Sequence, residues 1–227
     1  MIVRAATCPH PPLLLPGATG LPVREVSELR AACRTAVDDL VAAAPDVLVA
    51  VGSAPGTRTW PADAASPVSL FAPALGSAPE GDLLPLSLAV ARDLTETVPV
   101  PVEFHGIDAA APVELCRGHG RWLAGRPERI GLLVMADGSA RRGPKAPGHE
   151  DARALELDHL LGEALHVGDP GPFLDLAPDV AAELLVEGRV AWQVLAGACE
   201  GRAVDAKCRY SDDPFGVWYP VFTWTLE

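Results

Sequence analysis

Short apolar runs alternate with longer amphipathic stretches along much of the chain. Residues 2–7, 46–51 and 129–136 are apolar runs of the kind that form strands buried on both faces of a sheet. Residues 23–44 instead repeat apolar side chains at helical spacing, which predicts an amphipathic helix with Cys33 on its buried side. This alternation favours a largely parallel sheet with helices on both faces.

The rest of the chain continues this pattern and ends differently. We predict a strand over residues 101–104 and helices over residues 83–97, 112–124, 151–166 and 178–200. Two strand-like runs, residues 203–210 and 217–226, close the chain around Ser211-Asp212-Asp213-Pro214, which has the residue types of a turn. We therefore expect an α/β fold, a single three-layer αβα domain over residues 1–227, with a largely parallel central sheet and a C-terminal hairpin.

Composition narrows the range of partners. The chain has 227 residues and a formal net charge of −12 at pH 7, a charge that opposes binding to nucleic acid. No run approaches the roughly 18 to 20 apolar residues of a membrane span, so no membrane partner is expected. The five cysteines are widely spaced without a CxxC pair, which suits reduced thiols and a cytoplasmic protein.

Three predicted strands end at polar residues that could take part in binding or catalysis. The first is followed by His10 between prolines, the second by Ser53, and the strand over residues 129–136 by Asp137 and Ser139. Ligands of parallel α/β sheets bind outside the carboxyl ends of the strands, so we expect these four side chains to surround a cleft. The alternative for each motif is an ordinary tight turn.

The loop after Asp137 gathers positive charge in an otherwise acidic chain. Arg141, Arg142 and Lys145 lie within it, and His149 follows. Arginine binds carboxylate and phosphate groups through paired hydrogen bonds, so this loop is a candidate subsite for an anionic substrate. A solvated loop that pairs with acidic surface groups is the alternative.

Asp137 itself is expected to remain ionised. Its carboxylate is predicted to accept hydrogen bonds from the backbone N–H groups of Gly138 and Ser139, or from Arg141 or Arg142. Such bonds stabilise the charged form and lower the pKa of a carboxyl group. An ionised Asp137 would then orient His10 or polarise a substrate hydroxyl.

The order of these motifs resembles a known family. A first strand ending in His-Pro-Pro, a Gly-Ser turn after the second strand, Leu84-Pro85-Leu86 before a helix and a strand ending in Asp-Gly-Ser resemble the LigB-like superfamily of class III extradiol ring-cleavage dioxygenases. Memo-type proteins are related, and short actinobacterial members that continue Asp-Gly-Ser-Ala-Arg-Arg and Lys-Ala-Pro-Gly are closest. The resemblance implies one αβα domain and, in catalytic members, a nonheme ferrous iron that binds a catechol and dioxygen.

The resemblance can be carried over by position. His10 matches the first iron ligand, but residues 52–56 contain no histidine for the second, and Ala140 stands where the catalytic base is expected. The third ligand would lie in the loop before the last strand, at Asp212 or Asp213. A ferrous oxygenase typically uses two histidines and one carboxylate, so we expect no tightly held stoichiometric iron.

The other histidines offer little replacement for the missing ligand. His159, Glu163 and His166 share one face of a predicted helix, opposite its leucines, and are expected to face solvent. His105 and His119 lack a carboxylate or second histidine at ligand spacing, so structural roles are expected for both. His149 remains as the reserve ligand.

These observations leave three functions open. The first is a LigB-like protein that binds a small molecule, anionic or aromatic, at the strand ends. The second is a metal-free hydrolase in which His10 activates Ser53 or Ser139 and Asp137 orients the imidazole. The third is a noncatalytic binding protein on an inherited enzyme fold.

Overall fold

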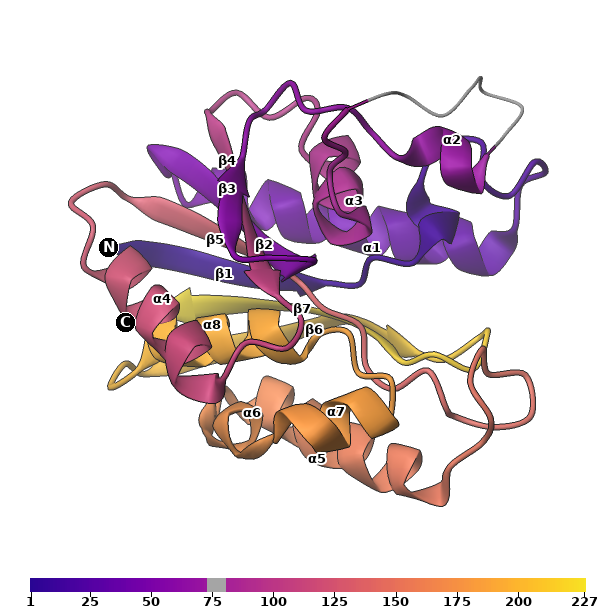
Figure 1. The fold of residues 1–227 in the computed structure, drawn as a ribbon. Coiled ribbons are helices and arrows are strands. Elements are labelled where there is room, and N and C mark those ends of the chain that lie inside the picture. The colour runs from indigo at the N-terminus through magenta and orange to yellow at the C-terminus, as the bar shows by residue number, and fades with distance from the viewer. Residues whose placement is uncertain (73–80) are drawn as a thin grey trace.

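The computed structural model describes residues 1–72 and 81–227, and its centre is a seven-stranded sheet of order β3-β4-β2-β5-β1-β7-β6 (Figure 1). Four neighbouring strands are parallel, and the remaining three pair antiparallel at the two edges. The parallel strands are β1 (Ile2–Cys8), β2 (Val47–Ala54), β4 (Val102–Asp108) and β5 (Ile130–Met135). The others are β3 (Arg58–Trp60), β6 (Val204–Asp212) and β7 (Tyr219–Leu226).

The buried strands are those with continuous apolar sequence. Every residue of β2 and β5 is buried, because these two strands lie at the centre of the sheet with helices on both sides. Most residues of β6 are exposed, since it is an edge strand. The predicted C-terminal hairpin is confirmed as β6 and β7.

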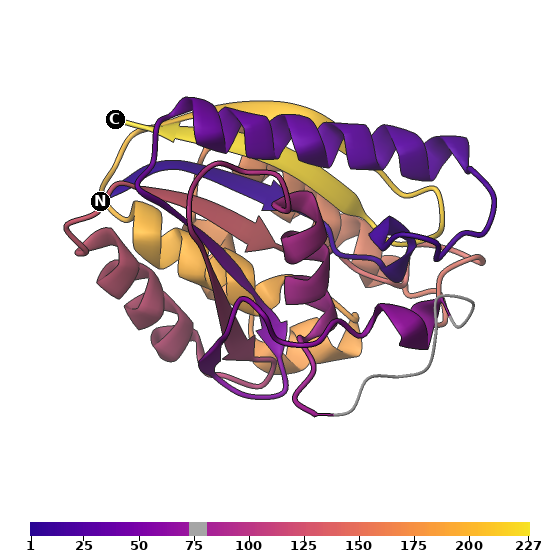
Figure 2. The same cartoon turned by 90° about the horizontal axis from the view of Figure 1, so that it is seen from above.

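Helices cover both faces of the sheet, so the predicted three-layer αβα architecture is confirmed (Figure 1). The longest helix runs along one face, as the view from above shows (Figure 2). On that face lie α1 (Arg24–Ala42), α2 (Val68–Phe71), α3 (Leu86–Leu94) and the 3-10 turn η1 (Pro12–Leu14). On the other lie α4 (Val113–Ala124), α5 (Ala152–Val167), α6 (Gly171–Asp175), α7 (Pro178–Glu183) and α8 (Arg189–Cys199).

Each helical layer packs on its own apolar core. Leu29 and Leu40 of α1 belong to the first core, and Cys33 is fully buried in it, as predicted. The second core contains Trp192 of α8 and Trp224 of β7, and both side chains are buried. Among the described residues, no helix combines the length and the apolar character that crossing a membrane requires.

The structure refines one predicted helical region and corrects the buried face of one predicted helix. The helical region expected over residues 178–200 is divided into α7 and α8, and Leu185 in the connecting segment has a positive φ of 52°. Leu160 of α5 is one of the leucines predicted to lie on the buried side of this helix, but it is 53% exposed. Asp158 is buried instead, at 2% exposure. Neither β3 nor α6 was predicted.

Candidate functional site

His10 and Asp137 meet at the carboxyl ends of the neighbouring strands β1 and β5. The parallel register pairs Cys8 with Met135, so both chains leave the sheet side by side. The backbone N–H of His10 donates to Asp137 Oδ1 at 2.7 Å, while the ring Nδ1 lies 3.8 Å from the same oxygen, beyond hydrogen-bond distance. His10 is 4% exposed, and its Nδ1 has no hydrogen-bond partner within the described part of the chain.

Asp137 differs from its prediction in its hydrogen-bond partners and in the direction of its pKa shift. The N–H groups of Gly138 and Ser139 donate elsewhere, to a backbone carbonyl and to the carboxylate of Asp158, each at 2.9 Å. Burial raises the pKa of Asp137, and the interactions with His10 lower it by less. The predicted donors and the predicted low pKa are therefore wrong, because the side chain is buried and receives its bond from another strand end.

Ser139 is a structural turn residue. Its side chain is fully buried, and its hydroxyl donates to the carbonyl of Leu184 at 2.6 Å. The same oxygen accepts the backbone N–H of Arg141 at 3.2 Å. Because the hydroxyl proton holds the segment after α7 against the end of β5, Ser139 is poorly placed to act as the nucleophile of a hydrolase.

Ser53 lines a cavity of 230 Å³ at the same edge of the sheet, which we call the Ser53 cavity. Strand β2, which contains Ser53, is the neighbour of β5, so Ser53 and Asp137 are on adjacent strand ends. His10 and Asp137 are absent from the lining, so the three residues share an edge but do not line this cavity together. The lining includes Ser53, Ala109, Leu185, Val186, Glu187 and Arg189.

Arg189, the first residue of α8, brings a buried positive charge to the Ser53 cavity. It is 3% exposed, and its guanidinium donates to Gln193 Oε1 at 2.9 Å and to the carbonyls of Ala109 and Ala111 at 2.7 and 2.9 Å. No carboxylate of the described residues forms an ion pair with it. Burial lowers the pKa of Arg189 accordingly.

Sequence reasoning missed Arg189, although the sequence holds a signal. The residues that follow it form an almost wholly apolar and buried helix. A positive charge at the first position of a helix opposes the helix dipole, which favours cations at the other end. A cation in that place, ahead of an apolar helix, indicates a role other than helix stability.

The predicted anion subsite in the loop after β5 is not assembled. The guanidinium of Arg141 donates to the carbonyl of His149 at 3.1 Å, and Nε of Arg142 lies 3.0 Å from Asp213 Oδ2. Lys145 and His149 are exposed and are absent from the lining of the Ser53 cavity. The prediction is wrong for Arg142 in particular, because acidic side chains already neutralise its charge.

The donor set for iron does not come together. Within residues 1–72 and 81–227, no group of three or more histidine, cysteine or acidic side chains is arranged to hold a metal ion. His10, Asp212 and Asp213 therefore form no ligand cluster, and Ser53 occupies the strand end where the resemblance called for a second histidine. The residues present therefore do not fit a ferrous centre.

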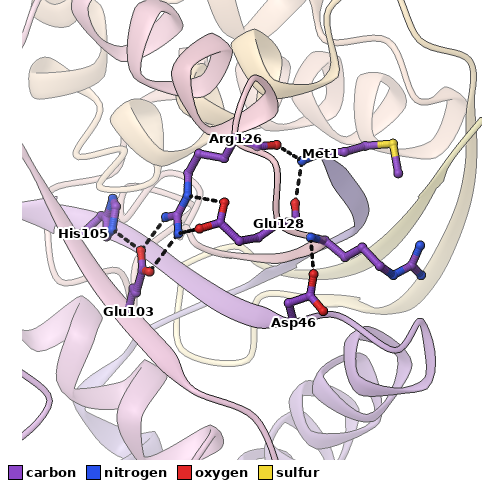
Figure 3. Close-up of polar contacts among 7 residues, drawn as sticks. Met1, Asp46, Glu103, His105, Arg126 and Glu128 are labelled. Atoms are coloured by element: carbon purple, nitrogen blue, oxygen red, sulfur yellow. Dashed lines mark hydrogen bonds and ion pairs between the residues drawn. The ribbon is translucent and has the colours of Figure 1, made fainter.

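His105 and His119 form a pair that spacing along the chain did not reveal. His105 Nδ1 lies 3.0 Å from His119 Nε2. Its Nε2 lies 3.1 Å from Glu103 Oε2 (Figure 3). Residues two apart on a strand share a face, which places Glu103 beside His105, and α4 brings His119 across from above. The expectation that neither histidine has such a partner is wrong.

Comparison with known proteins supports the fold and nothing finer. No protein-family model matches the chain, and no curated protein matches it. Among solved structures, the crystal structure of the uncharacterized protein JW3007 from Escherichia coli is similar with a TM-score of 0.59 at 16% sequence identity. The match covers 98% of this chain and 99% of that one, so the likeness extends over the whole α/β fold.

Proposed function

We propose that this is a LigB-like protein that binds a small carboxylate with an apolar or aromatic body in the Ser53 cavity. The buried guanidinium of Arg189 carries the proposal. In this account Arg189 receives the carboxylate, Ser53 offers a hydroxyl, and the apolar walls receive the body of the ligand.

The argument begins with the state of Arg189. Burying a charge without a counter-ion costs several kcal/mol, so a buried guanidinium is usually paired. Arg189 makes three hydrogen bonds, all to uncharged acceptors, out of the five N–H donors of a guanidinium. The donors left free are one on Nε and one on Nη1, since both Nη2 hydrogens are used, and each can give a single charge-assisted hydrogen bond to an anion such as a carboxylate.

The walls of the cavity restrict the size and chemistry of the ligand. Leu185 and Val186 are apolar, whereas Ser53 and Glu187 supply polar groups. A volume of 230 Å³ lies below the roughly 300 to 1,000 Å³ of drug-sized pockets, which favours a compact ligand. Glu187 repels a second negative charge, so a monoanion fits better than a dianion.

The position and the backbone of the cavity agree with a binding role. It lies at the carboxyl ends of parallel strands, where α/β proteins commonly bind their ligands. Leu185 in its wall holds a left-handed conformation, which costs a non-glycine residue of order 1–3 kcal/mol and is concentrated at functional sites.

The proposal is one of binding, and the chemistry of catalysis stays open. The ring-cleavage reaction of the resembled family needs iron, which the donor set does not fit. Of the two serines considered for a hydrolase, Ser53 lines a cavity, whereas the Ser139 hydroxyl donates to the carbonyl of Leu184. Hydrolysis of an ester by metal-free protein that is lost in Ser53→Ala would favour the hydrolase; its absence would favour the binding protein.

The test is calorimetric titration with three probes: protocatechuate, a catechol that carries a carboxylate; benzoate, which has only the carboxylate; and catechol, which has none. We expect protocatechuate and benzoate to bind and catechol to bind more weakly. Arg189→Lys should weaken carboxylate binding by about tenfold or more, because an ammonium cannot keep the bonds to the two carbonyls and Gln193 while donating to the ligand as well. Arg24→Gln, at an exposed arginine of α1, is the matched control and should change nothing. Equal affinity for catechol and benzoate, or an unaffected Arg189→Lys, would overturn the proposal.

A further inference from the structure

A second cavity lies between α5 and the β6–β7 hairpin, and none of its lining residues belongs to the Ser53 cavity. Its volume is 260 Å³. The predicted exposure of His159, Glu163 and His166 is confirmed, yet these side chains form one wall of the cavity rather than a featureless helix surface. The lining also includes Ser211, Asp212 and Asp213 from the hairpin and the buried residues Asp158 and Trp218.

Asp158 is a buried polar residue in this cavity, and its side chain is 1% exposed. Its Oδ1 accepts the backbone N–H of Ser139, whereas Oδ2 has no hydrogen-bond partner among the described residues. The nearest cation is Arg142, whose Nε lies 3.7 Å from Oδ2 but 3.0 Å from Asp213. One oxygen of a buried carboxylate is thus left without a donor.

The Asp-Gly-Ser sequence explains how Asp158 is held there. A side-chain carbon at Gly138 would lie 2.8 Å from Trp218 Cβ and 2.9 Å from Asp158 Oδ1, too close for any residue but glycine. Gly138 therefore allows both side chains to pack under the turn. The Trp218 indole N–H donates to Ser211 Oγ at 2.9 Å, which fixes the ring against the hairpin.

The charge of the cavity selects the sign of a ligand. Its lining has four carboxylates and a single guanidinium, so with neutral histidines its net charge is −3 when Asp158 is ionised and −2 when Asp158 is protonated. The acidic groups lie at two levels, Asp158 within the wall and Glu163, Asp212 and Asp213 at more exposed positions. Leu155 and the ring of Trp218 provide apolar surface.

We propose that this cavity binds a small aliphatic amine, with an ammonium group that pairs with the carboxylate of Asp158 and, in a diamine, a second one near Glu163 and Asp212. The apolar chain between them would lie against Trp218, whose ring face also attracts cations. A divalent metal ion is disfavoured, since no group of three or more histidine, cysteine or acidic side chains in the described parts of the chain is arranged to hold one.

Binding of an amine at this site should be coupled to the release of a proton. The pKa of Asp158 is raised to about 7, chiefly by burial; the bond from Ser139 and the charge of Arg142 lower it, and the charge of Asp213 raises it. The other titratable groups at the cavity are His159, Glu163, His166 and Asp212. An ammonium binds the ionised carboxylate, so binding should release a proton from Asp158 near neutral pH and strengthen as the pH rises from about 6 to 8.

The experiment is calorimetric titration of the whole chain with putrescine, an aliphatic diamine. Wild-type protein should bind one equivalent, and Asp158→Asn, which keeps the acceptor for Ser139 but removes the charge, should weaken binding by about tenfold or more. Glu163→Gln should weaken it by about two- to threefold, as for a more exposed charge. Glu156→Gln, an exposed residue of α5 outside the cavity, is the matched control and should bind as wild type does.

Further readouts keep the proposal falsifiable if Asp158→Asn fails to fold. In nitrogen-15 spectra of the wild type, putrescine should shift the amide of Ser139 and the indole N–H of Trp218, and Glu163→Gln should shift the titration midpoint. No saturable binding, equal losses in Glu156→Gln and Glu163→Gln, or shifts remote from Ser139 and Trp218 would overturn the proposal. So would tighter binding of magnesium or zinc chloride alone that depends on Asp158.

Discussion

The amino-terminal end of the parallel sheet is held together by matched charges, whereas its carboxyl-terminal end buries charged and polar groups without full partners. At the amino ends, Arg126 donates to Glu103 at 2.6 and 3.0 Å and to Glu128 at 3.1 and 3.3 Å (Figure 3). The nitrogen of Met1 donates to two carbonyls nearby, and Asp46 accepts a backbone N–H of the adjoining strand. This network satisfies its own members.

At the carboxyl ends the pairing is incomplete. Nδ1 of His10 and Oδ2 of Asp158 have no hydrogen-bond partner within the described ranges, and Arg189 has no carboxylate to neutralise it. Buried polar groups are nearly always satisfied in native proteins, so each exception calls for an explanation. The contrast is one of degree, since Nε of Arg4 also lacks a partner among the described residues. On our proposal, the amino end of the sheet serves the fold and the carboxyl end retains interactions for ligands.

The largest expected effect comes from removing the buried charge. Arg189→Met leaves the carbonyls of Ala109 and Ala111 and the amide oxygen of Gln193 without their donor, and we expect the free energy of unfolding to fall by about 3 kcal/mol. Urea denaturation measures it. Adding benzoate should raise the stability of wild type and leave that of Arg189→Met unchanged. Equal stabilisation of both proteins would contradict a ligand-binding role for Arg189 at the carboxyl end of the sheet.

A smaller effect is expected at the amino-terminal end. The ion pair with Arg126 lowers the pKa of Glu103, so the carboxylate contributes stability above its unfolded pKa that is lost as the pH falls through the folded value. Glu103→Gln should cost about 1 kcal/mol at neutral pH, because the pair is partly solvated, and this difference should shrink below about pH 4. Carboxylate binding at the other end should stay unchanged. A loss of binding in Glu103→Gln would show that the two ends are coupled.

The pair of His105 and His119 predicts a pH dependence of stability that comes from a neutral ring rather than from an ionised carboxylate. Burial lowers the pKa of His119 to about 4, so the unfolded chain binds a proton at a higher pH than the folded one. Stability contributed by the neutral ring is therefore present above about pH 6.5 and is lost as the pH falls toward 4. Replacement by Gln should flatten this part of the stability profile by about 1 kcal/mol. Identical profiles for His119→Gln and wild type would contradict the buried neutral pair.

Asp137→Asn should have the smallest effect. The amide oxygen can still accept the N–H of His10, and burial already disfavours the charged form of the carboxyl group. We expect a change in the free energy of unfolding below about 1 kcal/mol, measured by thermal melting. A larger loss would mean that the charge of Asp137 supports the strand ends and that its pairing with His10 is structural.

The fold was more predictable than the site, for reasons visible in particular residues. Apolar runs located β1, β2 and β5, and the resulting strand ends identified His10 and Asp137, because parallel strands carry their ends to one edge. Arg189 and Asp158 depend on what packs around them in three dimensions. Asp158 follows Ala154 by four residues and precedes Leu161 by three, so it lies on the buried face of α5. The helical periodicity of the leucines predicted Leu160 on that face instead.

The His105 and His119 pair shows the same limit. Their contact joins a strand to the helix that follows it, and no spacing along the chain encodes that crossing. The division between α7 and α8 also escaped periodicity, since it rests on one left-handed residue, Leu185, inside an otherwise helical run. Sequence patterns thus predicted the layers, while the charges that distinguish the two ends of the sheet required their tertiary neighbours.

The central claim is that the buried guanidinium of Arg189 binds an anion. The side-chain Nε–H resonance of this arginine tests that claim most directly. In protein labelled with nitrogen-15 at arginine, the Arg189→Lys spectrum identifies the resonance by its absence. Titration of the wild type with benzoate should shift the Arg189 signal in a saturable way and leave that of the exposed Arg24 in place. Saturable binding of benzoate with an unmoved Arg189 resonance would contradict the account.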